Sequence, residues 1–437
     1  MTHTLNGPQV PDTAPATAAP PAPVKQRDAF FDNAKFMTIT LVVVGHLWAQ
    51  LRGSQAEHSA YMVIYAFHMP LFTFITGYFS RGYIRSTDKL RGLLPTVIAP
   101  YVIFTLLSRA NLYFVADKPF PADQWLEPHF VTWFLAALVC WRLSAPLWRH
   151  LRFPVTTSVV VALVVGGWDL SSDKNVGHTI ILLPFFVFGL TVDTELFDRL
   201  RRRARWWMGA PVLLGVFLAF YLWTSSYVDR RVTALSYWCD TYRDMKMSLP
   251  VGVAARLMAF ALAIALGAAF LALVPKRRTW FTELGTRTMY VFLLHALVLK
   301  VFDYTKLLDE PAVQSRAGLV LTTLAAVGLS VVLASAPVRR ATHWLVEPRV
   351  GWLLSKPAAR HAAKPTNAAP AVPAVPAVPT VPTAPAAPAA PAAPAAPAAT
   401  EPAPAAEPPT DRIIPSQASE PTIGQAPHPG EPSHRRP

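Results

Sequence analysis

Two histidines lie inside apolar segments near the start of this chain. His46 ends a stretch that carries no charge after Lys35, and His68 lies in a second apolar stretch, two residues before Pro70. An ionisable group costs free energy in a hydrocarbon environment, so one that is kept there is functional by default. A neutral imidazole takes up a proton near physiological pH, which suits it to act as a general base or a nucleophile.

A charged cluster precedes His46 on the same segment and contains Arg27, Asp32 and Lys35. If the segment is helical, the step from Lys35 to His46 rises about 16 Å, close to three turns. The two side chains would then lie on roughly one face at different depths. Asp32 stands one helical turn before Lys35 and is expected to orient it.

The role of His68 has two open interpretations. Proline inside a helix frees a backbone carbonyl, and His68 is suited either to hydrogen-bond a neighbouring carbonyl at the kink or to share a site with His46. If the two segments are adjacent and antiparallel spans, both histidines fall in their outer halves. This arrangement predicts that they face one site.

The composition places these segments in a membrane protein. The chain has 437 residues, of which 52% are hydrophobic and 15% charged, and apolar windows of spanning length recur along it. We predict an all-α, polytopic integral membrane bundle of about ten transmembrane helices. The windows are centred on residues 35–51, 61–79, 93–114, 130–147, 155–168, 178–191, 207–223, 251–274, 289–303 and 317–337.

Basic residues predict the orientation of these spans. The segments 25–35, 81–91, 142–152, 199–205, 276–287 and the chain from 339 onward are rich in Lys and Arg, and they alternate with sparser or balanced loops. The positive-inside rule then places both termini in the cytoplasm. We expect a multi-pass protein of the plasma membrane, whose first span is kept because no signal peptide precedes it. The net charge of +14 is spread over short runs, which argues against a nucleic-acid partner.

Pro/Ala-rich composition predicts disordered ends around the membrane domain. We expect a disordered leader at 1–26, a transmembrane domain at 27–352 and a disordered tail at 353–437, because the ends offer little apolar surface to bury. Cys140 and Cys239 show no metal-ligand spacing and are interpreted as structural.

Short motifs around the two histidines resemble a known family. Asp-Asn-Ala-Lys at 32–35, Gly-His at 45–46, Phe-His-Met-Pro-Leu-Phe at 67–72 and Gly-Tyr-Phe at 77–79 are similar to the integral-membrane acyltransferase family 3, in its fucose 4-O-acetylase-like branch. Weaker matches follow in the expected order at 132–138, 284–295 and 347–348. The resemblance covers about residues 27 to 350.

The resemblance implies an O-acyltransferase. Such an enzyme moves an acyl group, usually acetyl from acetyl-CoA, to a hydroxyl of a carbohydrate or a glycosylated acceptor, without a permanently bound cofactor or metal. The family's histidine corresponds to His46 and its arginine to Lys35. Lysine keeps the charge of arginine but loses the planar fork, so we expect a point-charge contact to phosphate or carboxylate.

The predicted site follows from this correspondence. His46 acts as a general base towards the acceptor hydroxyl, or it accepts the acyl group and relays it. The predicted catalytic residues are His46, Lys35 and His68. The predicted contacts to acyl-CoA are Arg27, Asp32, Lys35, Arg81 and Arg85, although positive-inside anchoring explains Arg81 and Arg85 equally simply.

Several further side chains are weaker candidates. Arg109 and Arg256 could pair with a substrate or an acid, or extend to the membrane interface. His295 lies inside the ninth predicted span, and the loop 224–250 is long enough to form an acceptor-binding lid. The aromatic candidates for stacking on a sugar, which would equally suit an interfacial belt, are Trp133, Tyr61, Tyr65 and Tyr78.

Two other functions fit parts of the sequence. A transporter of a saccharide or lipid-linked precursor would use the intramembrane histidines for proton relay or gating, and discontinuous helices in both halves of the chain would favour it. The second span is interrupted by Pro70, but no corresponding span is evident in the second half. A scaffold that presents the Ala/Pro tail would leave the histidines unexplained.

Overall fold

The computed structural model describes residues 27–51, 54–84, 90–116, 126–168, 174–223 and 230–353. These residues form helices, turns and loops, and no strand occurs among them. The predicted leader at 1–26 and residues 354–437 of the predicted tail lie outside the described residues. The all-helical prediction is therefore confirmed for the described part of the chain.

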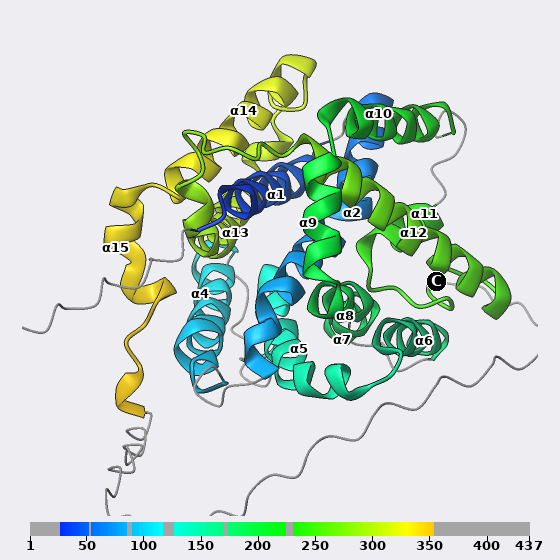
Figure 1. Cartoon of the computed structure of the whole chain (residues 1–437). Coiled ribbons are helices and arrows are strands. Elements are labelled where there is room, and N and C mark those ends of the chain that lie inside the picture. Colours follow the sequence, from blue (N-terminus) through cyan, green and yellow to red (C-terminus); the bar gives the residue numbers. More distant parts are fainter. Residues whose placement is uncertain are drawn as a thin grey trace, which may run out of the picture. The chain divides into compact units, whose positions relative to one another are not determined.

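The described helices follow one another along the chain as shown in Figure 1. Short 3-10 turns are η1 (Arg81–Ile84), η3 (Phe130–Thr132), η5 (Leu284–Arg287), η6 (Leu307–Asp309) and η7 (Gly351–Leu353), and η2 (Leu94–Ile98) is a π-helical turn that leads into α4. The α-helices are α1 (Ala29–Trp48), α2 (Gln55–Ser80), α4 (Ala99–Ala116), α5 (Trp133–His150), α6 (Pro154–Gly167), α7 (Lys174–Ile181), α8 (Leu183–Thr191), α9 (Thr194–Arg203), α10 (Trp206–Trp223), α11 (Arg230–Tyr237), α12 (Leu249–Leu273), α13 (Thr288–Tyr304), α14 (Arg316–Leu333) and α15 (Ala336–Val346).

Each predicted apolar window falls on a helix. Among the described residues, 8 helices are long and apolar enough to cross a membrane. The two remaining windows correspond to α1, which has 20 residues, and to α6, which has 14. The sixth window is divided at Leu182 into α7 and α8, where Pro184 occupies the first turn of α8. A helical, multi-pass membrane protein is confirmed, while the predicted count of about ten spans and the orientation stay predictions.

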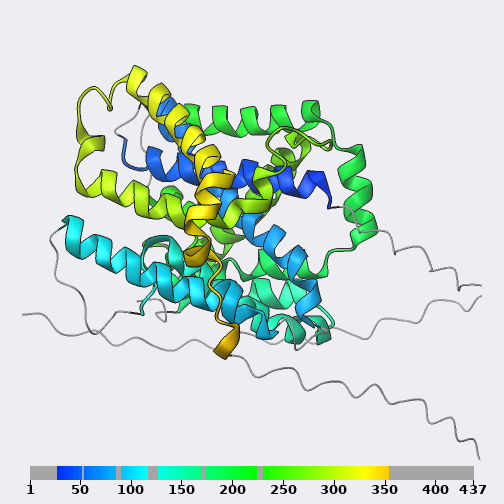
Figure 2. The same cartoon turned by 90° about the vertical axis from the view of Figure 1, so that its left-hand side faces the viewer.

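The first helix lies inside the bundle. It begins where the Asp28 side chain accepts a hydrogen bond from the backbone N–H of Phe30 at 3.0 Å, an N-cap that satisfies a free donor of the first turn. α1 then packs against α2, α13 and α14 (Figure 1). α15 lies across α4 and α13 (Figure 2). Both ends of α1 are therefore covered by elements from distant parts of the sequence.

α2 and α8 approach each other closely at two glycines. A Cβ atom on Gly77 would lie 2.1 Å from the carbonyl oxygen of Phe186, and one on Gly189 would lie 2.1 Å from that of Phe74. Small residues at a crossing allow two helix backbones to touch, which is the usual device in membrane bundles. α2 is thereby held in place along the half that follows Pro70.

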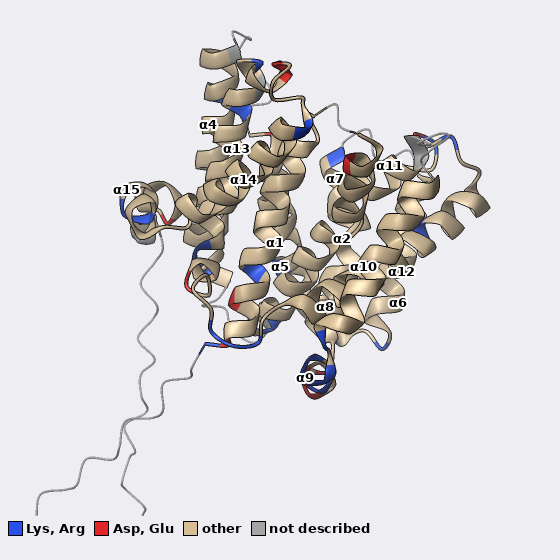
Figure 3. Ribbon diagram, turned by 90° about the horizontal axis from the view of Figure 1, so that it is seen from above, with Lys and Arg blue, Asp and Glu red and all other residues tan. Residues whose placement is uncertain are grey.

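The outer surface of the bundle suits a hydrocarbon environment. Large apolar side chains are exposed on several helices, including Leu214 and Leu222 on α10, Met258 on α12, and Leu321 and Leu324 on α14. Figure 3 shows that most charged segments lie towards the ends of the helices, with the basic helix α9 at one end. This distribution is expected of helices that cross a bilayer.

Candidate active site

The charged end of α1 is held together by an ion pair. The Nζ atom of Lys35 lies 2.6 Å from Oδ1 of Asp32, and the Asp32 side chain is buried while Lys35 is 19% exposed. The expected contact one helical turn apart is therefore present. Arg27 is mostly exposed, and its Nε lies 3.8 Å from Oδ2 of Asp32. One carboxylate thus faces two cations, and Lys35 keeps a route to solvent.

Asn33 fastens this end of α1 to the loop before α13. Its Nδ2 donates to the carbonyl oxygens of Pro275 and Arg277 at 2.8 and 3.0 Å. Its Oδ1 accepts from the hydroxyls of Thr282 and Thr279 at 2.7 and 3.2 Å. Asn33 is fully buried, and these hydrogen bonds use both sides of its amide. In the sequence, Asn33 stood only as a member of the Asp-Asn-Ala-Lys motif and had no predicted role, although a polar amide in an apolar helix is a signal of such a role.

At the other end of α1, His46 is surrounded by rings from three other elements. The centroids of the His46 and His295 rings are 5.7 Å apart, with the planes inclined by 28°. The ring of Phe130 from η3 lies 5.0 Å away, and the hydroxyl of Tyr65 is 3.4 Å from Nδ1 of His46. His46 itself is half-buried. The surroundings of this imidazole are therefore largely built by rings of the protein.

His295, a weaker candidate in the sequence, is the ring that stacks on His46. It is fully buried, and its Nδ1 lies 2.8 Å from the carbonyl oxygen of Val291. Because a carbonyl only accepts, this contact places the proton on Nδ1 and leaves Nε2 as an acceptor. Nε2 has no hydrogen-bond partner among the described residues. A buried acceptor without a partner beside another imidazole needs an explanation, and a bound substrate or water supplies one.

His68 occupies a more ordinary position. It is buried, and its Nδ1 lies 2.8 Å from the carbonyl oxygen of Ile64 in its own helix. The ring of Tyr65 contacts His68 at 4.8 Å and His46 at 6.4 Å between centroids. The carbonyl contact corresponds to the structural interpretation of His68, while Tyr65 connects it to the surroundings of His46. Its predicted catalytic role stays a prediction.

The predicted aromatic residues are divided between two regions. Tyr61 and Tyr65 pack at 4.1 Å, and the Tyr61 hydroxyl lies 2.9 Å from that of Tyr237 in α11. This group adjoins His46 through Tyr65. By contrast, Trp133 stacks on His178 at 4.1 Å, and Tyr78 packs against Phe31 near the charged end of α1. Of the predicted aromatic residues, Tyr65 contacts His46 directly, and Tyr61 packs against Tyr65.

The predicted lid contributes to this border. Residues 224–229 lie outside the described residues, but the part that follows forms α11 and a loop. The Trp238 Nε1 donates to the carbonyl oxygen of Tyr65 at 3.2 Å. Arg256, fully buried on α12, donates to the carbonyl oxygen of Asp240 at 2.7 Å. Arg256 therefore anchors the loop and does not extend to the membrane interface, the alternative that the sequence left open.

Cationic side chains lie on the α4 side of the histidine pair. The Nζ of Lys300 lies 4.8 Å from the centre of the Phe130 ring. Arg109 is 7% exposed, and among the described residues its guanidinium contacts the side chain of Glu127, at 3.9 Å, and the carbonyl of the same residue, at 3.4 Å. Burial and the positive charges of Arg109 and Lys300 lower the pKa of His129 to about 4. His129 is therefore neutral at pH 7.

Phe130 is held in an uncommon backbone conformation. Its φ angle is 54°, in the left-handed region that side chains with a Cβ rarely adopt. The next residues continue into α5, and the Thr132 hydroxyl accepts from the backbone N–H of His129 at 2.9 Å. This turn places the Phe130 ring between His46 and Lys300.

Two predicted contacts to acyl-CoA remain, Arg81 and Arg85. Arg81 donates from Nη2 to the carbonyl oxygens of Gly189, at 3.1 Å, and Val192, and its guanidinium lies over the Tyr78 ring. It thus caps the end of α8, where cations interact favourably with the helix dipole. Arg85 lies outside the described residues. No cluster of His, Cys, Asp and Glu able to hold a metal ion occurs in the described segments.

Comparison with known families decides what kind of protein carries this site. The family model described as an acyltransferase domain, of the acyltransferase family 3, matches residues 28–335. The chain belongs to this acyltransferase family. The match begins at the N-cap of α1 and contains both ends of the site. The family predicted from the motifs of α1 and α2 is confirmed, and the fucose 4-O-acetylase-like branch stays a prediction.

The chain is also similar to a curated protein. The chain is 28% identical over 220 residues to the nodulation protein NolL of Mesorhizobium japonicum (strain LMG 29417 / CECT 9101 / MAFF 303099). The aligned region covers 46% of this chain and 58% of that relative. No solved structure matches the chain significantly. The comparisons give no support to the transporter alternative.

Proposed function

We propose that this acyltransferase moves an acyl group, acetyl in the simplest case, from acyl-CoA to a hydroxyl of a carbohydrate or glycosylated acceptor at the plasma membrane. The observation that carries the proposal is the distribution of groups along α1. The Asp32–Lys35 ion pair lies at its first turns, and His46 lies at its last, packed against His295. The negatively charged acyl-CoA needs a cation such as Lys35, and the acceptor hydroxyl needs a proton acceptor such as His46, at a separate position.

The charged end of α1 suits the phosphates of coenzyme A. Lys35 supplies a compact positive charge, and Asp32 restricts its side chain without neutralising Arg27 as well. The basic segments at 81–91 and 276–287 add positive charge to the same predicted cytoplasmic side. Arg81 and Arg85 remain part of the proposed donor site, although Arg81 also binds the end of α8.

The surroundings of His46 suit a carbohydrate hydroxyl. Tyr61, Tyr65 and Tyr237 offer ring faces and hydroxyl groups beside the imidazole. Sugars are bound by this combination of apolar faces and hydrogen-bonding groups. His68 supports Tyr65 from the buried side. The loop that follows α11 would close over the acceptor as a lid.

The chemistry balances with residues already present. The acceptor oxygen attacks the thioester carbonyl carbon, and its proton passes to a ring nitrogen of His46. The C–S bond then breaks, and the departing thiolate of coenzyme A takes up a proton from the imidazolium. General-base assistance of this kind contributes roughly 10²–10⁴ in rate. In the relay alternative, His46 first carries the acyl group and then transfers it to the hydroxyl.

Acetyl transfer in purified vesicles tests the proposal. With labelled acetyl-CoA and a carbohydrate acceptor, we expect His46→Gln to lose roughly 10²-fold or more in rate, because the proton acceptor is gone. His150→Gln is the matched control, since His150 is exposed at the end of α5. Undiminished transfer by His46→Gln would remove the catalytic claim. Saccharide flux without acyl transfer would instead favour a transporter.

A further inference from the structure

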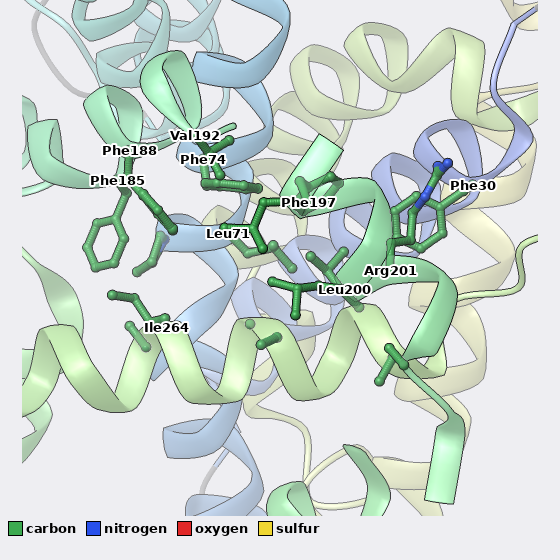
Figure 4. A pocket seen from close by; sticks show the side chains of 18 residues that line it. Phe30, Leu71, Phe74, Phe185, Phe188, Val192, Phe197, Leu200, Arg201 and Ile264 are labelled. Carbon is green, nitrogen blue, oxygen red and sulfur yellow. The ribbon is translucent and has the colours of Figure 1, made fainter. Parts of the chain in front are cut away.

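A cavity of about 330 Å³ lies away from the histidine pair, between α2, α8, α9 and α12 (Figure 4). Its walls are apolar, with Leu71 and Phe74 from α2, Phe188 from α8 and Ile264 from α12. Arg201 is the only charged residue among the described residues that line it. Such a lining accepts a hydrocarbon chain and disfavours a polar ligand.

The cavity has the depth of one membrane leaflet. On α12 its lining runs from Ala263 to Ala272, a rise of about 14 Å along the helix. The hydrocarbon core of a bilayer is about 30 Å thick, so a single leaflet accounts for about 15 Å. The slot therefore extends from near the predicted midplane to the end of the bundle that carries α9. Small residues on α12, Ala263, Gly267 and Ala268, leave the space open.

α9 joins this apolar slot to a basic surface. Leu196, Phe197 and Leu200 on one side of the helix line the cavity, while Arg202 and Arg203 are exposed. Helices of this pattern lie in the interface plane with the apolar face inward and attract anionic lipids. The sequence analysis predicts this end to be cytoplasmic, because 199–205 is among its basic segments.

Positive charge is concentrated at the mouth of the cavity. The Nζ of Lys276 donates to the carbonyl oxygens of Arg202 and Ala204 at 3.2 and 2.6 Å. Burial and the charges of Arg205 and Arg201 lower the pKa of Lys276 below its ordinary value. The Arg201 guanidinium is shared with Asp28 and Asp198. A negatively charged group at this position would meet several cations.

The cavity is separate from the proposed reaction site. None of the rings that contact His46, namely those of Tyr65, Phe130 and His295, belongs to its lining. A donor thioester in this slot would not face the imidazole. Membrane lipids are the apolar molecules that can enter this slot from the bilayer.

We propose that this cavity binds one acyl chain of an anionic phospholipid from the cytoplasmic leaflet, with the phosphate headgroup held by the basic end of α9 and Lys276. The chain fills an apolar slot of leaflet depth, and the headgroup meets the cluster of cations at its mouth. Because Arg201 also pairs with Asp28, the N-cap of α1, the bound lipid lies beside the start of the helix that carries Lys35.

Blocking the slot tests the binding of the chain. A Cβ atom on Gly267 would meet only the Leu71 side chain, at 3.8 and 3.9 Å, whereas one on Gly215 of α10 would meet nothing within 4 Å. Gly267→Phe therefore fills the cavity, and Gly215→Phe adds the same bulk to an open surface. After delipidation of the full-length chain in detergent, phosphatidylglycerol binding is measured by native mass spectrometry. We expect a roughly tenfold or greater loss of affinity for Gly267→Phe and none for Gly215→Phe.

Folding is monitored by the unfolding midpoint of each variant. If Gly267→Phe fails to fold, Gly267→Leu replaces it, because its smaller side chain leaves part of the slot empty and should weaken binding less. Equal phosphatidylglycerol binding by the Gly267 variants and Gly215→Phe would overturn the proposal.

The headgroup is tested by the preference between two lipids. Wild-type protein should bind phosphatidylglycerol more tightly than phosphatidylcholine of the same chains. Arg202→Gln with Arg203→Gln, at the basic end of α9, should remove this preference, while Arg339→Gln with Arg340→Gln, on the exposed side of α15, should keep it. Equal binding of the two lipids by the wild type would overturn the proposal. Displacement of phosphatidylglycerol by a long-chain acyl-CoA, and not by further phospholipid, would also overturn it.

Discussion

His46 and His295 differ in how the protein holds them. The Nδ1 of His295 contacts a carbonyl of its own helix, which fixes the tautomer and the orientation of a fully buried ring. His46 is half-buried and meets the Tyr65 hydroxyl only at 3.4 Å. The more accessible ring is suited to exchange protons with an acceptor. The buried ring is suited to position it.

Replacing His295 should lower the turnover without affecting donor binding. We expect His295→Gln to reduce kcat by less than the roughly 10²–10⁴-fold attributed to a general base, with an unchanged KM for acetyl-CoA. If His295 acts through His46, the double variant with His46→Gln should be no slower than His46→Gln alone, because groups that work as a unit give non-additive losses. Steady-state kinetics in vesicles measures both. If the losses in kcat of the two single variants multiply in the double variant, His295 does not act through His46.

Lys35 should matter for the nucleotide end of the donor. We expect Lys35→Met to raise the KM for acetyl-CoA about tenfold or more, since one charge-assisted contact is lost, while Lys35→Arg keeps most of the affinity. A short acetyl thioester without the nucleotide serves as the control substrate. Its rate should be equal in wild type and Lys35→Met. A parallel loss with both substrates would show that Lys35 acts elsewhere.

At the residue scale, the sequence predicted local contacts better than distant ones. The ion pair of Asp32 with Lys35 follows from their separation by one helical turn. The roles of His295 and Phe130 depend on helices and turns remote in sequence, and no local pattern reveals such a meeting. Asn33 had a local signal, because an amide in an apolar segment needs partners, but its partners could not be named.

At the scale of elements, the loop at 275–282 holds the first turns of α1 in place. Asn33 is its main attachment, with donors and acceptors both satisfied. We expect Asn33→Ala to destabilise the protein by about 1–3 kcal/mol, because buried carbonyls and hydroxyls lose their partners. The measurement is the unfolding midpoint in detergent.

Thr40→Ala is the matched control for this prediction. The Thr40 hydroxyl donates only to the carbonyl oxygen of Phe36 in the same helix, at 2.9 Å. Its loss should change the midpoint little. Equal effects of the two substitutions would mean that the loop is held by other contacts, such as the close packing of Gly285 on the Asp32 carbonyl.

Apolar length predicted most elements, but not those that depend on packing. The windows of α2 and α12 were predicted from the sequence because a membrane span needs about 20 apolar residues and both stretches are long enough. The helix α9 was not predicted, because the basic segment at 199–205 was used only to assign orientation by the positive-inside rule. Its leucines and phenylalanine nevertheless form an apolar side. The break at Leu182 was missed, although Pro184, in the first turn of α8, is a local signal for the start of a helix.

At the scale of the whole molecule, the orientation in the membrane is testable with cysteine labelling. Glu310→Cys, in the loop before α14, should react with an impermeant maleimide in intact cells, while Arg203→Cys should react only after permeabilisation. Both positions are exposed. The reason is the predicted alternation of basic and less basic loops. The reverse pattern would invert the predicted topology.

The two native cysteines, Cys140 and Cys239, could also react with the maleimide and must be controlled. Cys140 is exposed and is replaced by alanine. Cys239 can stay, because burial and the neighbouring Asp240 raise the pKa of its thiol to about 12. Since the thiolate is the reactive form, almost none is present at pH 7 and no label is expected there. Labelling of Cys239 in the folded protein would indicate that the loop after α11 opens.

The class of the molecule was predictable because it rests on summed composition, whereas the site was only partly predictable. Composition and loop charges average over many residues and tolerate local errors. The surroundings of His46 depend on which helices become neighbours. α13 reaches α1 from the second half of the chain, and Phe130 of η3 contacts His46. The separate cavity beside α12 exists only because several helices leave it unfilled.

The backbone of Phe130 adopts a conformation that costs free energy of folding. A left-handed φ of 54° is disfavoured for a residue with a Cβ, by about 1–2 kcal/mol, and glycine would adopt it freely. The chain nevertheless carries a phenylalanine there, whose ring contacts both His46 and Lys300. On the proposed function, stability and activity would favour different residues at this position. A search for stabilising substitutions that reaches Phe130 should be expected to trade turnover for thermal tolerance.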